Sequence, residues 1–165
     1  GISVIASSEE NIAYWSKLAG VQNISYDKIN QLRHVRYLKD KAHTLELMKR
    51  HAQVLQPKFR MVLKMLRSEL TNKGIAHWHH PVGGYFVCVA AMPGTAKRTL
   101  ELCKQLGVTF TPAGATHPKG IDPEDSMIRL APSYPPVEEL EAAMNVFCVC
   151  LKLAALEKYL DEKLV

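Results

Sequence analysis

The sequence lacks the features of several large classes of protein. It has no run of about 18 apolar residues, which a membrane-spanning helix needs, and no signal peptide with a basic start. Aromatic residues make up only 7% of the chain and are not interleaved with basic residues, as a groove for single-stranded nucleic acid requires. The sequence therefore argues against a membrane protein and against nucleic acid as the main partner.

Cysteines and runs of charge are also scarce. Four cysteines lie in apolar segments without a C-x-x-C pair, namely Cys88, Cys103, Cys148 and Cys150. Their surroundings favour reduced thiols in a protein core, and hence a cytoplasmic location. The 21 Lys and Arg residues are scattered among 16 Asp and Glu, so the net charge of +5 forms no basic tract. What is present is a globular composition, 47% hydrophobic over 165 residues, enough for one domain and part of another.

The first part of the chain predicts one strand and one very long helix. Residues 2–6 are typical of a buried strand, and a helix follows to about Leu18. A buried strand needs neighbours on both sides and none is nearby, so we expect this chain to be the C-terminal part of a longer protein. From Asp27 to Leu70, apolar residues recur at steps of three and four, which predicts an amphipathic helix kinked or broken at Pro57. Such a helix either crosses between domains or subunits, or folds into a two-helix hairpin.

The rest of the chain alternates strands and helices. The spacing of apolar residues favours an antiparallel hairpin, a helix, two strands separated by a long loop, and a final helix. The expected strands are Ile75–His80, Tyr85–Ala90, Val108–Thr111 and Met127–Ala131, the helices Thr95–Gly107 and Pro135–Leu160, and the loop Pro112–Asp125. The predicted fold class is α/β (an α+β sandwich), in which helices cover a small, mostly antiparallel sheet. We expect the last of these strands to be central.

Arg129 places a permanent charge in that last apolar strand. A guanidinium is not neutralised by deprotonation, so inside a protein it needs an anionic partner. Its planar fork of donors fits a carboxylate through two parallel hydrogen bonds. The partner is either an Asp or Glu of the same protein, which is the commoner arrangement, or the carboxylate of a ligand.

Three other groups of residues carry less chemistry. His77 and His79 share one face of their expected strand and His80 lies on the other, so a zinc site lacks a third ligand and we expect no metal. Asp122 and its acidic neighbours could act as paired carboxylates, but acids on a Pro- and Gly-rich loop more often form a solvated turn. Each lysine lies in a polar context, so none stands out as a nucleophile.

Several motifs follow one another in a fixed order. They are PVGGYF at 81–86, LGV at 106–108, TPAG at 111–114 and IRLA at 128–131. With DKINQLRH at 27–34, the set resembles the C-terminal region of pyridoxal-phosphate-dependent class I/II aminotransferases, most closely the aspartate-aminotransferase-like bacterial subgroup. The resemblance covers essentially the whole chain.

The resemblance implies a reaction and a site. In this family the arginine of the strand after the long loop holds the α-carboxylate of the amino-acid substrate, which assigns that role to Arg129 ahead of an internal ion pair. Gly84 and Tyr85 would lie beside the substrate channel. Ser25 and Tyr26 would reach the phosphate of the pyridoxal phosphate held by the other subunit of a homodimer. The implied reaction transfers an amino group between an amino acid and a 2-oxo acid.

The catalytic lysine of the family precedes a segment like residues 1–7, so we expect it upstream of this chain. The expected organisation is the last strand and helix of a large cofactor-binding domain in 1–24, an interdomain helix in 25–70 and a small C-terminal domain in 71–165. The fragment alone is expected to be inactive. The alternative is a standalone, non-enzymatic α/β module that binds a carboxylate through Arg129 or mediates dimerisation.

Overall fold

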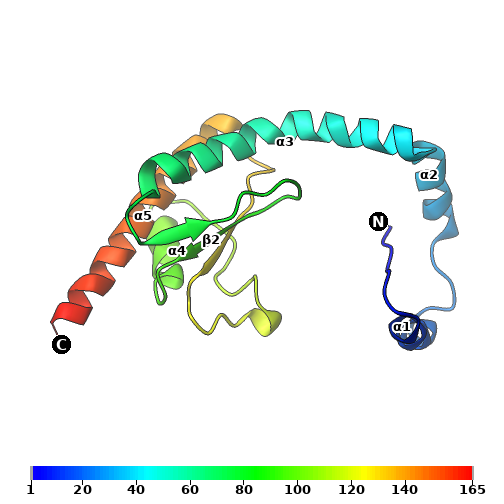
Figure 1. Cartoon of the computed structure of the whole chain (residues 1–165), viewed down its shortest axis with the longest axis horizontal. Helices are drawn as coiled ribbons and strands as arrows, with labels where there is room; N and C mark the ends of the chain where they lie inside the picture. The colour runs from blue at the N-terminus through cyan, green and yellow to red at the C-terminus, as the bar shows by residue number, and fades with distance from the viewer. Residues whose placement is uncertain (1, 165) are drawn as a thin grey trace. The chain divides into compact units, whose positions relative to one another are not determined.

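The computed structural model describes residues 2–164 of the chain. The chain divides into two compact units, Gly1–His51 and Ala52–Val165. The helices are α1 (Glu9–Gln22), α2 (Lys28–Leu38), α3 (Lys41–Leu70), α4 (Ala96–Gln105) and α5 (Val137–Lys163), with a short 3-10 helix η1 (Pro118–Gly120). The strands are β1 (Ala76–Trp78), β2 (Val87–Ala91) and β3 (Met127–Leu130), and Figure 1 follows these elements along the chain.

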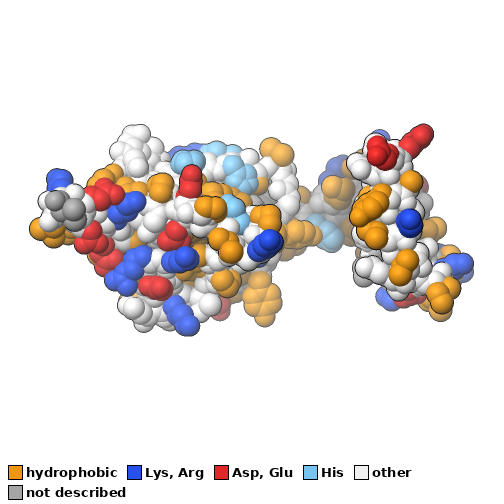
Figure 2. Space-filling model, turned by 90° about the horizontal axis from the view of Figure 1, so that it is seen from below, with side chains coloured by type: hydrophobic (Ala, Val, Ile, Leu, Met, Phe, Trp, Pro, Cys, Tyr) orange, Lys and Arg blue, Asp and Glu red, His pale blue; other side chains and the backbone are white. Residues whose placement is uncertain are grey.

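The N-terminal unit is made of helices with clear start signals. α1 begins after Ser8, whose hydroxyl accepts the N–H of Asn11 at 3.4 Å. Asp27 starts α2 in the same way, because its carboxylate accepts the N–H of Asn30 at 2.9 Å. In the described part of this unit only Ala19 is buried. Its large apolar side chains therefore lie at the surface, and Figure 2 shows hydrophobic side chains exposed among charged ones.

Residues 2–6, expected to be a buried strand, form no strand and are exposed. An extended segment becomes a strand only when a neighbour accepts and donates its backbone hydrogen bonds. Among residues 2–164 the only sheet consists of β1, β2 and β3, so this segment has no such neighbour. The helix after it was predicted correctly, although it extends to Gln22 instead of Leu18.

The expected single long helix is in fact two helices, and the break lies at Lys39 and Asp40 instead of Pro57. Lys39 has a φ of +56°, outside the helical region, and this ends α2. Asp40 accepts the N–H of His43 at 2.8 Å and so starts α3. Pro57 lies inside α3, where it removes one backbone hydrogen bond without ending the helix.

The C-terminal unit contains a three-stranded antiparallel sheet in the order β1-β2-β3. The hairpin of β1 and β2 was predicted correctly. β3 is an edge strand and not the central strand, and its pairing with β2 places Cys88 opposite Arg129. The expected strand at 108–111 does not form, because Phe110 in this segment packs against Phe147 of α5, with ring centroids 5.4 Å apart, and not against a sheet edge.

One face of the sheet carries the hydrophobic core. Side chains alternate along a strand, so Val87 and Val89 of β2 and Ile128 and Leu130 of β3 are buried together. The helices contribute Val62, Leu66, Leu70, Leu102, Cys103, Met144, Phe147, Cys148 and Leu151 to the same core. Figure 1 shows α3, α4 and α5 beside the sheet.

The predicted fold class is therefore confirmed, since helices cover a small antiparallel sheet on one face. Within residues 2–164, no helix is both long enough and apolar enough to cross a membrane.

Candidate functional site

Arg129 lies on the face of the sheet that the core does not use. The burial pattern of β3 alternates, with Ile128 and Leu130 directed into the core, so the side chain of Arg129 extends from the opposite face. Cys88 shares that face, because it is the register partner of Arg129 on β2. The strand thus brings a cation to the edge of the core without burying it fully.

The guanidinium of Arg129 stacks on an aromatic ring and has no anionic partner among residues 2–164. Its central carbon lies 4.4 Å from the centroid of the Phe86 ring, which is a cation–π contact. Nε is buried and makes no hydrogen bond, and no Asp or Glu of the described chain forms an ion pair with the group. The internal ion pair is therefore absent here. A buried donor without a partner is unfavourable, so the site favours an anion from outside.

The turn between β1 and β2 carries Gly84 and Tyr85, both assigned to the substrate channel from the sequence. Gly84 has a φ of +88°, a left-handed conformation that favours glycine. A Cβ built on Gly84 would meet no atom within 4 Å, so its role in the described chain is the turn itself and not a close approach. Tyr85 is 56% exposed. The residue that this turn delivers to Arg129 is Phe86, which follows Tyr85.

Phe86 was missed as a site residue when the sequence was interpreted. The available signal was the alternation of side chains along a strand, which places residues 86, 88 and 90 on one face of the hairpin. The second signal was the antiparallel register, which carries that face to the partner strand. Neither signal is sufficient without knowing that β2 pairs with β3.

His79 holds the same turn from the β1 side. Its Nδ1 lies 3.3 Å from both the backbone N and the backbone O of Cys88, so the ring either accepts from the N–H or donates to the carbonyl. This contact uses one of the two ring nitrogens of His79. In the described part of the chain no group of three His, Cys, Asp or Glu side chains is arranged to hold a metal ion.

Asp122 fastens the long loop to the start of β3. Its carboxylate accepts backbone N–H groups from Glu124 at 3.1 Å, Ser126 at 2.8 Å and Met127 at 2.7 Å. Burial by itself raises the pKa of Asp122, but the three donors outweigh it and the net pKa lies below its usual value, with a smaller effect from His117. The solvated-turn interpretation is therefore wrong for Asp122, whose side chain is only 3% exposed. Its role is to hold the strand that carries Arg129.

The neighbouring Asp125 joins this loop to α4. Its carboxylate accepts the N–H of Lys97 at 3.1 Å, and its backbone carbonyl accepts the N–H of Ala96 at 2.9 Å, so it occupies the N-terminal end of the helix.

The loop is also packed tightly against itself. A Cβ on Gly114, which has a φ of +84°, would lie 2.1 Å from the carbonyl oxygen of Gly120. Only glycine fits at position 114.

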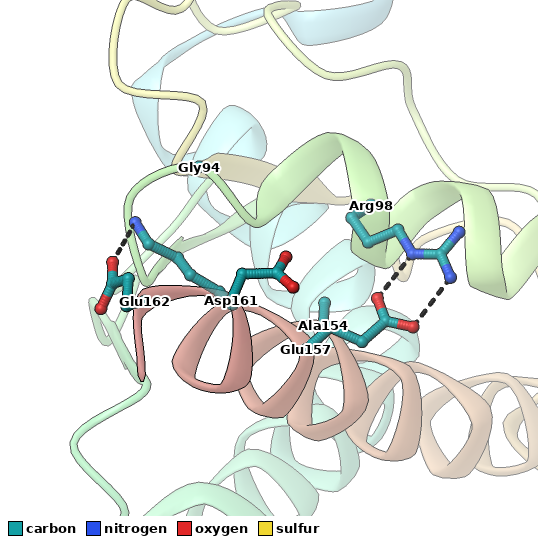
Figure 3. Close-up of a pocket in the computed structure, with 7 residues that line it drawn as sticks. Gly94, Arg98, Ala154, Glu157, Asp161 and Glu162 are labelled. Atoms are coloured by element: carbon teal, nitrogen blue, oxygen red, sulfur yellow. Dashed lines mark hydrogen bonds and ion pairs between the residues drawn. The ribbon is translucent and has the colours of Figure 1, made fainter. Parts of the chain in front are cut away.

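A hollow between α4 and the end of α5 is not a comparable site, because both of its cations, Arg98 and Lys158, already have carboxylate partners. Arg98 donates through Nε and Nη2 to both oxygens of Glu157, at 2.7 and 2.8 Å. Lys158 lies 3.6 Å from Glu162 and also donates to the carbonyl of Pro93. Figure 3 shows the Arg98–Glu157 pair bridging the two helices, whereas Glu162 is paired along α5 itself. We interpret the hollow as a fastening between α4 and α5.

Other lysines also have structural partners. Lys152 of α5 donates to Glu69 of α3, and this contact lowers the pKa of Glu69. Lys58 of α3 donates to the backbone carbonyls of Ser133 and Tyr134, at 2.8 and 3.3 Å. The two carbonyls thereby tie the segment after β3 to α3. The expectation that no lysine here is marked as a nucleophile stays a prediction.

Ser25 and Tyr26 lie in the connector between α1 and α2, in the N-terminal unit. Both are exposed, and Tyr26 is 50% exposed. Their two hydroxyl groups are hydrogen-bond donors of the kind that hold a phosphate. The chemistry of these residues thus fits the phosphate of a cofactor.

Three of the four cysteines are core thiols, and the expectation is wrong for Cys88, which lies on the face of the sheet opposite the core. Cys103, Cys148 and Cys150 are buried and Cys88 is partly exposed, and all are unpaired. Burial raises the pKa of Cys103 to about 12, with further contributions from Cys150, and burial raises that of Cys148 to about 12. Neither thiol is a nucleophile at neutral pH.

Comparison with known proteins identifies relatives over nearly the whole chain. The sequence model of a family described as aspartate amino-transferase matches residues 1–163. An aspartate aminotransferase of Corynebacterium glutamicum is 45% identical over 159 residues, which is 96% of this chain and 37% of the relative. A putative aminotransferase of Mycolicibacterium smegmatis is 42% identical over 99% of this chain and 38% of the relative. This chain thus spans a little over a third of the length of these relatives.

Solved structures agree with the fold. A crystal structure of an aspartate transaminase from Corynebacterium glutamicum superposes with a TM-score of 0.82 at 46% identity, covering 93% of this chain and 36% of the other. LysN, an α-aminoadipate aminotransferase from Thermus thermophilus, shares the fold with a TM-score of 0.70 at 18% identity, covering 91% of this chain and 37% of LysN. That structure contains N-(5'-phosphopyridoxyl)-L-leucine. The ordered motifs, the fold and the family match agree, and the chain belongs to the aspartate aminotransferase family.

Proposed function

We propose that this chain is the carboxylate-binding part of an aminotransferase that transfers an amino group between an amino acid and a 2-oxo acid, and that Arg129 binds the α-carboxylate. The observation that carries the proposal is the guanidinium of Arg129, which has a buried, unbonded Nε and no ion pair among residues 2–164. The family supplies the reaction class. We also propose that residues 1–24 belong to a larger cofactor domain, 25–70 to an interdomain segment and 71–165 to the small domain.

The geometry of Arg129 suits both substrates of such a reaction. An amino acid and a 2-oxo acid share the same carboxylate, so one guanidinium serves both halves of the reaction. Two parallel hydrogen bonds from the fork fix the carboxylate in orientation as well as in position. Gly84 and Tyr85 are proposed to line the approach to it, because their turn leads directly into Phe86 on the guanidinium.

Pyridoxal phosphate is the proposed cofactor. When bound, it acts as an electron sink for the carbon that carries the amino group. Ser25 and Tyr26 would hold its phosphate through their exposed hydroxyls. This chain spans a little over a third of the length of its relatives, and we propose that the catalytic lysine belongs to the rest of the enzyme and that the chain alone is inactive.

A second subunit is the proposed cover for the N-terminal unit, so that the enzyme is a homodimer. An apolar surface of this extent normally lies in an interface. The exposed apolar residues of the unit include Tyr14, Trp15, Leu18, Val21, Ile24, Ile29, Leu32, Val35 and Tyr37. The unpaired thiols support a reducing, cytoplasmic location.

The standalone module is not favoured, because the chain is 45% identical to an aspartate aminotransferase.

The test is the kinetics of Arg129→Lys in the whole enzyme that contains this chain. Lysine keeps the charge but loses the fork, so one hydrogen bond to the carboxylate is lost. A bond of this charged kind contributes about 1.5–3 kcal/mol, which predicts a rise in KM on the order of 10- to 100-fold for both the amino acid and the 2-oxo acid. Unchanged KM values for both would refute the role given to Arg129.

A further inference from the structure

Phe86 places its aromatic ring against the guanidinium of Arg129. Their contact is 4.4 Å from the guanidinium carbon to the ring centroid. Phe86 stands one residue before β2, and its side chain remains 42% exposed. It is therefore not buried as a core residue, and its ring lies against the cation of Arg129.

The contact with Phe86 leaves the in-plane N–H donors of the guanidinium free for a ligand. A cation–π contact uses the flat face of the group, whereas its N–H donors point outward in the plane. Nε has no hydrogen-bond partner and the group forms no ion pair among residues 2–164, so its in-plane donors remain for an anion. A carboxylate that approaches in the plane of the group meets two parallel donors.

Within residues 2–164 the guanidinium forms no ion pair, and its Nε has no hydrogen-bond partner. An arginine side chain has several rotatable bonds, and ordering it for a bidentate contact costs conformational entropy. Structural arginines are usually held by carboxylates, as Arg98 is held by Glu157. Arg129 lacks such a partner, so the ring is the group that restricts its orientation before a ligand binds.

The position of the ring is itself fixed by the turn. Gly84 supplies the left-handed conformation, and Nδ1 of His79 contacts the backbone of Cys88 at 3.3 Å. These two features bracket Phe86 in the chain. The ring is thus held by backbone geometry and not by its own burial.

We propose that Phe86 is the positioning residue of the carboxylate site, where its ring face orients the Arg129 fork for substrate. This inference rests on the proposed function of Arg129. Phe86 takes no part in the chemistry of amino transfer, so it affects the binding of every substrate that carries the carboxylate, and affects each by the same factor. That equality is what a merely structural residue would not produce.

The experiment compares Phe86→Leu, Phe86→Met and Phe86→Tyr in the whole enzyme. Leu and Met keep an apolar side chain but remove the π face, and Tyr keeps the face. The measurements are KM and kcat for the amino acid and the 2-oxo acid, the inhibition constant of a simple unreactive carboxylate, acetate, and the midpoint of thermal unfolding. Tyr159→Leu is the matched control, since Tyr159 is a 44% exposed aromatic residue on α5.

The expected result is a rise on the order of ten-fold in both KM values and in the inhibition constant of acetate for Leu and Met, with kcat unchanged. Phe86→Tyr and Tyr159→Leu should behave as the wild type. The inference is overturned if Leu and Met leave all three constants unchanged while Arg129→Lys raises them, or if Tyr is as damaging as Leu. If Arg129→Lys also changes nothing, the proposed function fails as well. Two non-aromatic variants are used so that a result is obtained if one does not fold.

Discussion

Replacing Asp122 by asparagine tests how the loop holds the strand of Arg129. The carboxylate accepts two N–H groups on Oδ2, from Ser126 at 2.8 Å and Met127 at 2.7 Å, and one on Oδ1, from Glu124 at 3.1 Å. An amide has a single oxygen. If that oxygen takes the place of Oδ2, the NH₂ group faces the N–H of Glu124, and two donors oppose each other.

The size of the expected loss in stability follows from these three hydrogen bonds. One bond is lost with its donor left unpaired, and the other two lose the benefit of a charged acceptor. A hydrogen bond to a charged group contributes about 1.5–3 kcal/mol, and water reaches the exposed N–H of Glu124, so we expect Asp122→Asn to lower the free energy of unfolding by about 2 kcal/mol at neutral pH. The Asp122 side chain is only 3% exposed, so water compensates little for the weaker bonds to Ser126 and Met127.

The effect should depend on pH in a defined direction. The pKa of Asp122 is lower in the folded protein than in the unfolded chain, so its stabilisation is complete above the unfolded value of about 3.9. It is lost as the pH falls through the folded value. The asparagine variant has no such group, so the difference between the two proteins should shrink as the pH falls below about 4.

The assay is urea unfolding at a series of pH values, with Glu124→Gln as the control. Glu124 lies in the same loop and is exposed, so this change removes one negative charge without breaking a described side-chain contact. The control should stay within about 0.5 kcal/mol of the wild type. The reasoning is refuted if both variants unfold at the same urea concentration, or if the deficit of Asp122→Asn is the same at pH 7 and at pH 3.

Two further predictions concern packing and reactivity. Gly114→Ala should destabilise the protein by more than about 1 kcal/mol in the same urea assay. The new Cβ would lie 2.1 Å from the backbone oxygen of Gly120, and the φ of +84° at this position is unfavourable for alanine. Unchanged stability would show that this loop rearranges freely. A thiol-alkylating reagent at pH 8 should modify Cys88 in the native protein but not Cys103 or Cys148, because pKa values of about 12 keep these two thiols protonated. Intact-mass measurement followed by tryptic mapping checks this. Rapid labelling of Cys103 would contradict its burial.

The sequence predicted the C-terminal unit better than the N-terminal one. The hairpin, α4, α5 and the strand of Arg129 follow from side-chain periodicity, because each buries one face in a core that lies within this chain. Residues 2–6 have the same apolar signature, but the described chain offers no neighbouring strand to pair with them. Apolar pattern alone does not report whether a hydrogen-bonding partner exists.

The long helix expected at 27–70 shows a second limit of predicting structure from the pattern of side chains. Pro57 is the stronger helix breaker by propensity, yet the break lies at Asp40, whose side chain provides an N-terminal cap. A proline removes one hydrogen bond, and the flanking turns of α3 keep the rest. The capping aspartate was visible in the sequence and was given too little weight.

For the site, the sequence pointed to Arg129 and to a carboxylate, but not to what surrounds the guanidinium. Whether an internal acid pairs with Arg129 depends on tertiary contacts that periodicity does not contain. The same holds for Phe86, which lies 43 positions before Arg129 in the printed sequence and meets it only because β2 pairs with β3.

Arg129 has no acidic partner among residues 2–164, and we propose that it binds the carboxylate of a substrate instead. A crystal structure of the whole enzyme with a bound amino acid or 2-oxo acid tests this most directly. The account predicts the substrate carboxylate within about 3 Å of two nitrogens of the guanidinium, with the Phe86 ring still on its face. An Asp or Glu side chain in that place, with the substrate carboxylate bound elsewhere, would contradict it.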